Sequence, residues 1–160
     1  MNRKDLLSDW STVIFPVVVI IFLLLLAGCQ TLPTVRPADL PAFVGNGTSV
    51  IMFTKDVCPP CDVQEGILAG LATGFPRIKF GKVYAYDAFI QPTDSNMVDA
   101  YNLKWTPTTI LQVDGKEACR WTTLHGRDQM WPMLRAFDSG YFVLGPDGIF
   151  RVNPVTGDRE

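Results

Sequence analysis

The fold is decided by ten residues that lead from an apolar strand into a cysteine pair: Met52-Phe53-Thr54-Lys55-Asp56-Val57-Cys58-Pro59-Pro60-Cys61. The run from Ser49 to Thr54 is mostly apolar, which indicates a buried strand. Apolar residues recur at helical spacing beyond the pair and predict a helix there: Val63, Ile67, Leu68 and Leu71. The two cysteines therefore lie where a strand passes into a helix.

Strands and helices continue to alternate as far as residue 137, an order that predicts an α/β fold with some parallel pairing. A second strand is expected at Val83 to Tyr86. A hairpin should follow, with strands at Thr108 to Val113 and Lys116 to Thr122. The Asp114-Gly115 turn between them supplies the positive φ angles that tight turns require. The expected architecture is a central mixed sheet flanked by helices.

Two further helices and a terminal hairpin complete the prediction. A short helix should open near Thr93 or Asp94, with apolar residues at Met97, Val98 and Tyr101. The last helix carries apolar residues at helical spacing: Met130, Leu134 and Phe137. Pro132 is expected near its first turn, since a proline further inside would remove a hydrogen bond. Tyr141 to Val152 is predicted to add a hairpin, and residues 139–160 are an extension beyond the domain.

Composition excludes several kinds of protein. The chain has 160 residues, with 14 Lys and Arg against 16 Asp and Glu, a net charge of -2 and 48% apolar residues. Nucleic-acid binding through phosphate neutralisation needs a basic surface. Nucleic acid is therefore not expected as a partner. The high apolar fraction also excludes a wholly disordered chain.

Residues 1–29 are predicted to be a secretory signal. An apolar run from Val13 to Gly28 follows Arg3 and Lys4, and it is shorter than the roughly 20 residues that a membrane-spanning helix needs. Its end, Leu26-Ala27-Gly28-Cys29, resembles a bacterial lipobox, and this resemblance implies that Cys29 is acylated and begins the mature chain. The alternative is an uncleaved anchor or a signal cut elsewhere. Both predict attachment to a bacterial membrane, inner or outer, on its periplasmic face.

Residues 30–42 carry three prolines and few large apolar side chains: Pro33, Pro37 and Pro41 mark the stretch. Such a composition is expected to stay extended, because it buries too little surface to fold. This stretch is therefore predicted to be a tether, with the folded domain at residues 43–138.

Cys58 and Cys61 have the spacing of a redox pair, and a helix start suits that chemistry. Unpaired backbone N–H groups and the helix dipole stabilise an anion there, which favours the thiolate of Cys58 as the exposed, attacking nucleophile. Cys61, one turn further in, is placed to resolve the mixed disulfide. Pro59 and Pro60 suit the first turn of a helix, where an N–H is not needed.

These residues and a second motif, Trp105-Thr106-Pro107-Thr108-Thr109-Ile110, resemble the thioredoxin superfamily over roughly residues 44–137. The resemblance implies a thioredoxin-like fold and thiol–disulfide oxidoreductase activity without a dissociable cofactor. It implies that Pro107 is cis and lies against the redox pair, and that the backbone of Thr106 pairs with the substrate chain. Trp105 is assigned to the site because it adjoins Thr106. The implied partners are protein thiols or disulfides and an unidentified redox partner protein.

Three positions differ from thioredoxins proper. Met52 stands where they have a buried acid, Val57 where they have tryptophan, and Pro59 where they have glycine. Thr106, in contrast, is similar to the residue found there in periplasmic disulfide isomerases. Since the dipeptide and the stabilisation of the thiolate shift such potentials by more than about 100 mV, the direction of electron flow is open. We expect a reductase or isomerase.

Several other residues have a structural interpretation beside a functional one. Cys119 is expected to be a small buried or half-buried residue of its strand rather than a third redox thiol, and His125 a loop residue rather than a catalytic base. Trp121 and Trp131 are expected in the core rather than on an apolar rim for unfolded substrates. Charged side chains near the pair are assigned to solvated loops or turns: Lys55, Asp56 and Asp87.

Two alternatives to redox catalysis remain at the cysteine pair. One is a structural disulfide in a non-catalytic binding module, and the other is a thiol chaperone for metal or haem maturation. A metal site needs further ligands, and His125 with Cys119 is the only other soft-donor set in the domain. No metal is therefore predicted.

Overall fold

The computed structural model describes residues 16–19, 31–145 and 148–151. The chain divides into two compact units, Met1–Gln30 and Thr31–Glu160. Within the described residues, no helix has both the length and the apolar character that crossing a membrane requires. Of the predicted signal only residues 16–19 are described, and Cys29 lies outside the described residues.

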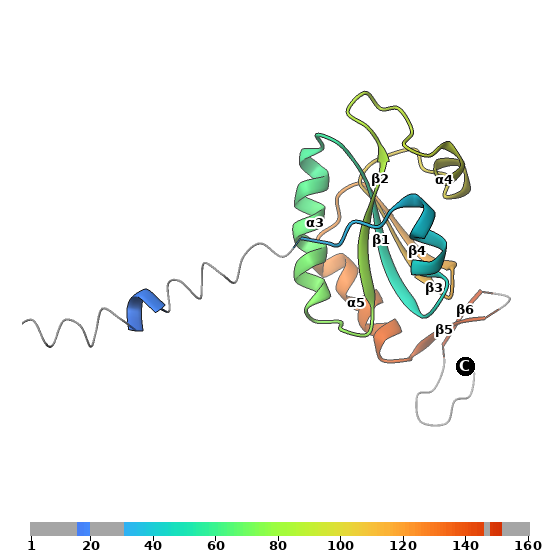
Figure 1. The fold of residues 1–160 in the computed structure, drawn as a ribbon. Helices are drawn as coiled ribbons and strands as arrows, with labels where there is room; N and C mark the ends of the chain where they lie inside the picture. Colours follow the sequence, from blue (N-terminus) through green and yellow to red (C-terminus); the bar gives the residue numbers. More distant parts are fainter. Residues whose placement is uncertain (1–15, 20–30, 146–147, 152–160) are drawn as a thin grey trace, which may run out of the picture. The chain divides into compact units, whose positions relative to one another are not determined.

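Four strands form the central sheet of the second unit: β1 (Thr48–Lys55), β2 (Lys79–Tyr86), β3 (Thr108–Val113) and β4 (Lys116–Thr122). Their order is β2-β1-β3-β4. Strand β1 pairs in parallel with β2 and antiparallel with β3, and β3 pairs antiparallel with β4. Figure 1 shows the sheet at the centre of the domain, between helices. The predicted mixed sheet is confirmed, although β2 begins four residues earlier than expected.

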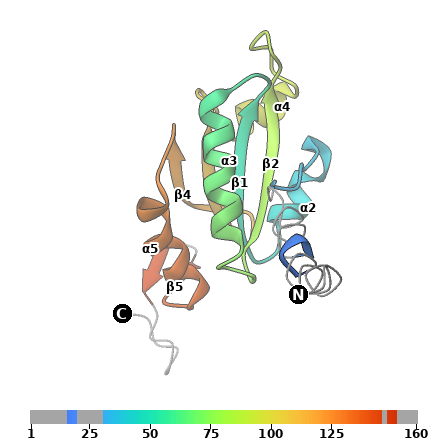
Figure 2. The same cartoon turned by 90° about the vertical axis from the view of Figure 1, so that its left-hand side faces the viewer.

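Helices cover both faces of the sheet: α2 (Leu40–Val44), α3 (Pro59–Ala72), α4 (Ser95–Ala100) and α5 (Arg127–Asp138). Helices α3 and α5 share a core with Val50 and Met52 of β1, whereas α2 and α4 pack with Ile51 and Phe53. Successive residues of a strand point to opposite faces, so β1 is buried on both sides. In Figure 2, α3 lies in front of β1.

The start of α4 and the terminal hairpin agree with the sequence prediction. Asp94 is the N-cap of α4, and its carboxylate accepts the N–H of Met97 at 3.1 Å. Strands β5 (Phe142–Gly145) and β6 (Gly148–Arg151) form an antiparallel pair. This hairpin is a separate sheet of two strands and does not extend the central one.

Pro132 lies in the second turn of α5, further inside the helix than the expected position near the first turn. The helix begins at Arg127, because Gly126 precedes it as an N-cap whose N–H donates to the side chain of Gln129 at 3.0 Å. Pro132 is therefore inside the helix. A residue with an N–H at this position would donate to the carbonyl of Asp128. Asp128 is exposed, so water can bond to that carbonyl instead.

Residues 31–42 are not the extended tether that their prolines predict. Leu32, Val35 and Leu40 are buried, so the folded domain begins near residue 31. A short 3-10 helix, η1 (Pro37–Asp39), leads into α2. The prediction was wrong because the prolines stand where no N–H is needed: Pro37 and Pro41 lie in the first turns of η1 and α2.

The N-terminal segment is attached to the outer edge of β2. The N–H of Val35 donates to the carbonyl of Lys82 at 2.8 Å, and the N–H of Lys82 donates to the carbonyl of Pro33 at 2.9 Å. On α3, Glu65 forms an ion pair with Lys82 at 2.7 Å and accepts the N–H of Leu32 at 3.1 Å. Burial is the largest single influence on Lys82 and disfavours its charge, but the hydrogen bond and charge of Glu65, with a contribution from Tyr84, together raise the pKa of Lys82.

Candidate active site

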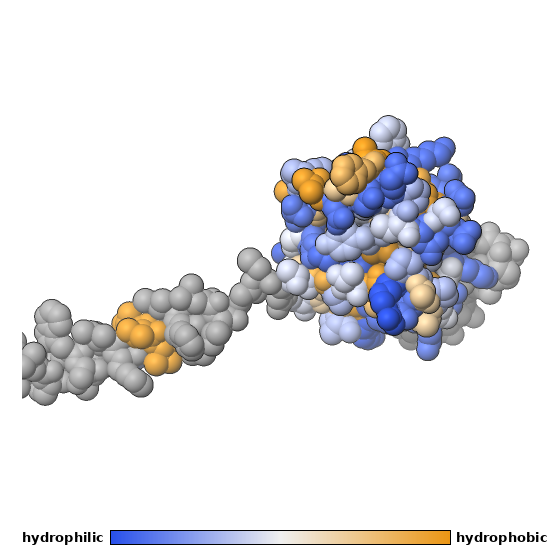
Figure 3. Space-filling model, turned by 45° about the horizontal axis from the view of Figure 1, so that its top comes forward, coloured by the Kyte–Doolittle hydropathy of each residue, from blue (hydrophilic) through white to orange (hydrophobic). Residues whose placement is uncertain are grey.

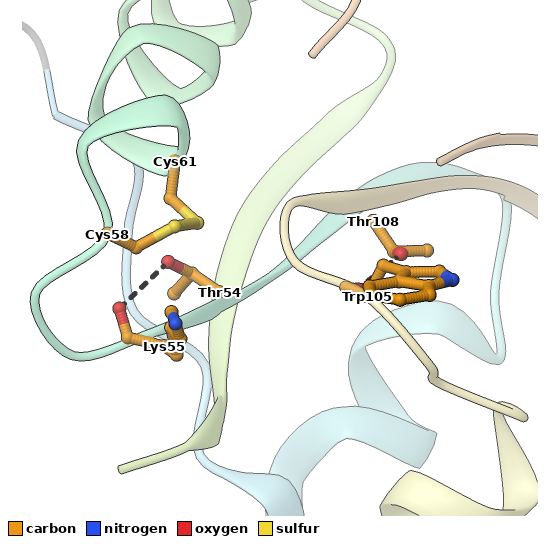
Figure 4. The surroundings of a disulfide bond; sticks show 6 residues. All are labelled: Thr54, Lys55, Cys58, Cys61, Trp105 and Thr108. Carbon is orange, nitrogen blue, oxygen red and sulfur yellow. Dashed lines mark hydrogen bonds between the residues drawn. A yellow bond between two sulfur atoms is a disulfide. The ribbon is translucent and has the colours of Figure 1, made fainter. Parts of the chain in front are cut away.

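A disulfide joins Cys58 and Cys61, whose Cα atoms are 5.2 Å apart. Cys58 is the N-cap of α3, and Cys61 lies in the first turn of that helix. Strand β1 ends at Lys55, so the predicted junction between strand and helix is confirmed. Figure 4 shows the disulfide beside Thr54 and Lys55 at the end of this strand.

The first turn of α3 offers fewer hydrogen-bond donors than a helix start usually does. Pro59 and Pro60 occupy its first two positions and have no N–H. The next two N–H groups, of Cys61 and Asp62, both donate to the carbonyl of Cys58, at 2.8 and 3.1 Å. A thiolate at Cys58 therefore depends mainly on the helix dipole. The carboxylate of Asp62 in the same turn opposes it.

Cys58 is far less accessible in this oxidised form than the prediction of an exposed nucleophile requires. It is 4% exposed, and Cys61 is 1% exposed. The neighbouring residues project instead: Pro59 and Pro60 are exposed, and Val57 is 85% exposed. The disulfide is thus shielded by the turn that carries it.

Val57, directly before the pair, has a positive φ of 53°. This left-handed conformation costs a residue with a Cβ about 1–2 kcal/mol and is rare for a β-branched one. Its side chain is not held by burial. Backbone strain is therefore stored next to the redox pair, as is found at functional sites.

The Thr106–Pro107 peptide bond is cis, as the resemblance implies. Pro107 is buried, and its carbonyl accepts the N–H of Thr123 at 2.8 Å. Thr108 pairs with Phe53 near the end of β1. Pro107 therefore lies at the same end of the sheet as the cysteine pair.

Trp105 does not cover the disulfide. Figure 4 shows its ring turned away from the sulfur atoms and lying beside Thr108, whose hydroxyl donates to the carbonyl of Trp105 at 2.7 Å. The side chain is 65% exposed. The structure thus brings Cys58, Cys61 and Pro107 to one end of the sheet and places the Trp105 ring to one side of them.

Gln64 is a site residue that the sequence analysis missed. It is fully buried on α3, one turn beyond Cys61. Its Oε1 accepts the N–H of His125 at 2.7 Å, and its Nε2 donates to Sδ of Met130 at 3.3 Å. The buried residues of α3 are Cys61, Gln64, Leu68, Ala69 and Leu71, whereas the predicted Val63 is 53% exposed. A polar residue three positions after Cys61 was the available signal.

The remaining candidates have the structural roles that were expected. Trp121 is buried, and the ring of Trp131 packs on Phe75 with centroids 4.7 Å apart. Asp87 is a turn residue, since its carboxylate accepts the N–H groups of Phe89 and Gln91. At the end of β1, the side chain of Asp56 is exposed and that of Lys55 is half-buried.

Two residues outside the pair, Cys119 and His125, also carry soft donor atoms, and neither is part of the redox pair. Cys119 is a half-buried free thiol of β4, and burial raises its pKa. His125 lies in the loop before α5, where its Nδ1 is 3.1 Å from the carbonyl of Thr123. In the described part of the chain, no group of three or more His, Cys, Asp or Glu is placed to hold a metal ion.

Known proteins share this architecture. No protein-family model matches the chain. A thioredoxin of Chlamydia pneumoniae is 28% identical over 82 residues, which are 51% of this chain and 74% of that protein. Thioredoxin f2 of Chlamydomonas reinhardtii superposes with a TM-score of 0.56 at 17% identity, over 65% of this chain and 94% of its own. A mutant thioredoxin of Halobacterium salinarum superposes with a TM-score of 0.57 at 19% identity, and the match covers 69% of this chain and 94% of that protein.

Proposed function

We propose that this chain, a thiol–disulfide oxidoreductase with a thioredoxin-like fold, reduces or isomerises disulfides of exported proteins while anchored to a bacterial membrane. The observation that carries the proposal is the disulfide between Cys58 and Cys61 at the start of α3, at the end of the sheet that also carries cis-Pro107. The similarity to a thioredoxin supports the same chemistry.

The surroundings of the pair favour the reducing direction. A redox pair is a strong oxidant when its reduced form is stabilised. Here Pro59 and Pro60 supply no N–H to a thiolate, and Asp62 repels it. The reduced form is therefore weakly stabilised, which lowers the potential.

In the proposed reaction the thiolate of Cys58 attacks one sulfur of a substrate disulfide. A mixed disulfide forms, and the other substrate sulfur leaves as a thiolate and takes up a proton. Cys61 loses its proton and attacks the sulfur of Cys58, which re-forms the Cys58–Cys61 disulfide and releases the second substrate thiol. Two electrons pass to the substrate. A redox partner protein must supply them, and no dissociable cofactor takes part.

Exposed apolar side chains at the same end of the domain support polypeptide substrates. They lie on the loops after β1, β2 and β4 and before β3: Val57, Phe89, Ile90, Trp105 and Leu124. Figure 3, in which this end comes forward, shows apolar surface among polar side chains. Unfolded chains present apolar segments that such a surface can contact.

Reduction of insulin by dithiothreitol with the full chain as catalyst tests the activity. The wild-type chain should accelerate the reaction, and Cys58→Ser should abolish the acceleration. Cys119→Ser is the matched control and should retain it. A wild-type rate no greater than that of Cys58→Ser would refute the proposal. Equilibration with thiol–disulfide buffers should give a potential below about -200 mV, and a higher potential would exclude the reducing direction.

One observation favours a second candidate, a binding module with a permanent disulfide: Cys58 is 4% exposed. Mild reduction followed by alkylation separates the two. An active pair should open and yield a rapidly alkylated Cys58, because a low-pKa thiol reacts as its thiolate. A permanent disulfide should resist reduction and leave both cysteines unmodified.

Membrane attachment is proposed on the signal and the Leu26-Ala27-Gly28-Cys29 motif. Labelling with a palmitate analogue in a bacterial host tests it. Label is expected on the wild-type chain and not on Cys29→Ser. Label that survives this substitution, or that is absent from the wild type, would exclude acylation at Cys29.

A further inference from the structure

A pocket of about 380 Å³ opens beside Trp105, on the loop that leads to cis-Pro107. Lys104, Glu117, Arg120 and Thr122 also line it. Thr108 contributes from the first position of β3, where it pairs with Phe53 near the end of β1. The side of the pocket formed by Trp105, Thr108 and Thr122 therefore lies at the end of the sheet that carries the disulfide, and the pocket continues along β4 toward Glu117.

The charges in the pocket leave an excess of hydrogen-bond donors. Glu117 accepts from Nε of Arg120 at 2.9 Å and from Nη2 at 2.6 Å, and Nη2 also donates to the carbonyl of Tyr101 at 3.0 Å. The carboxylate is thus occupied on both oxygens, and the guanidinium is fixed in place. Among the described residues, neither Nη1 of Arg120 nor the ammonium of Lys104 has a partner.

Trp105 adds an apolar wall to this polar pocket. Its ring lies beside Thr108 in Figure 4 and remains largely exposed. An exposed indole offers a flat face for aliphatic carbons or a peptide group. A side chain with a short aliphatic stem and a carboxylate end matches the wall and the free donors together.

We propose that this pocket binds a carboxylate of the polypeptide substrate, either an Asp or Glu side chain or the C-terminal group. The proposal rests on the proposed function and names a preference within it. An extended peptide advances about 3.3 Å per residue. The test therefore varies the number of residues between the cysteine that joins Cys58 and the carboxylate.

Short peptides that each hold one internal disulfide test this preference. One series carries a single Glu at successive distances from the reacting cysteine, and a matched series carries Gln. A third series has no acidic side chain and ends in a free or an amidated C-terminus. Turnover by the full chain is measured as kcat/KM for each peptide.

At one spacing, the Glu peptide should exceed its Gln partner by about fivefold, the gain of one favourable ion pair. Lys104→Met should bring the ratio near one, and Lys104→Glu should reverse it. Lys116→Met is the matched control, because Lys116 is an exposed cation at the start of β4 and does not line the pocket, and it should keep the ratio. Glu117→Gln should increase the ratio by releasing Arg120.

The outcomes separate this inference from the function on which it rests. No turnover of any peptide would refute the proposed function. Turnover with equal rates for Glu and Gln peptides at every spacing, and for free and amidated ends, would overturn the pocket alone. A ratio lost equally in Lys104→Met and Lys116→Met would also overturn it, since that result shows general attraction by net charge.

Discussion

Oε1 of Gln64 accepts the backbone N–H of His125 at 2.7 Å, and this bond ties α3 to the loop between β4 and α5. The same loop donates the N–H of Thr123 to the carbonyl of cis-Pro107. The helix that carries the cysteine pair and the loop that carries the proline are thus linked through one buried amide.

Gln64→Leu should destabilise the domain by about 1–3 kcal/mol, because the N–H of His125 loses its partner next to a buried apolar side chain. Urea unfolding of the full chain measures the change. Gln91→Leu is the control, since the side chain of Gln91 is exposed and should change the free energy of unfolding very little. Equal losses in the two variants would contradict the role of Gln64.

Gly81→Ala should cost about 1–3 kcal/mol, as overpacking does in a filled core. A Cβ at Gly81 would lie 2.9 Å from Cγ2 of Val35 and 3.2 Å from Cζ of Phe43. Gly66→Ala is the control on the exposed face of α3, where nothing lies within 4 Å. It should stabilise the helix by about 0.5–1 kcal/mol. Thermal unfolding of both variants should give shifts of opposite sign.

Val57→Gly should preserve or raise stability, because glycine adopts a φ of 53° without the penalty paid by valine. Val63→Gly is the matched control, since Val63 is an exposed valine inside α3. There glycine should lower the free energy of unfolding by about 0.5 kcal/mol. Chemical unfolding distinguishes the two, and a larger loss for Val57→Gly than for Val63→Gly would show that the turn is not strained.

Alkylation of Cys119 should depend on pH in the direction set by its burial. Burial disfavours the thiolate and raises the pKa of Cys119. In the oxidised Cys29→Ser chain, the iodoacetamide rate should therefore reach half of its maximum above the ordinary thiol pKa of about 8.5. A half-maximum for Cys119 at or below pH 8.5 would contradict the burial effect.

The parts of the fold and of the site that the sequence predicts are those with local signals. The strand before Cys58, the helix after it, the Asp94 cap and the Asp114-Gly115 turn each follow from residues within a few positions. The cis isomer of the Thr106–Pro107 bond was predicted from the resemblance to the thioredoxin superfamily, because the isomer depends on the whole fold.

The errors concern contacts between residues far apart in the chain. The prolines of residues 31–42 indicate an extended stretch, but the free edge of β2 and the carboxylate of Glu65 bind it. Gln64 is polar, yet the loop at His125 gives it a partner that makes its burial favourable. The Trp105 ring lies beside Thr108 and away from the disulfide, and no local sequence pattern encodes that direction.

Because residues 31–44 are folded as part of the domain, the domain would begin almost directly after a lipid on the proposed Cys29. Only Gln30 separates that cysteine from Thr31, and one extended residue spans at most about 3.6 Å. An enzyme anchored in the proposed way would search for substrates in two dimensions. It would meet disulfides of proteins close to the bilayer, and a soluble substrate would have to diffuse to that surface.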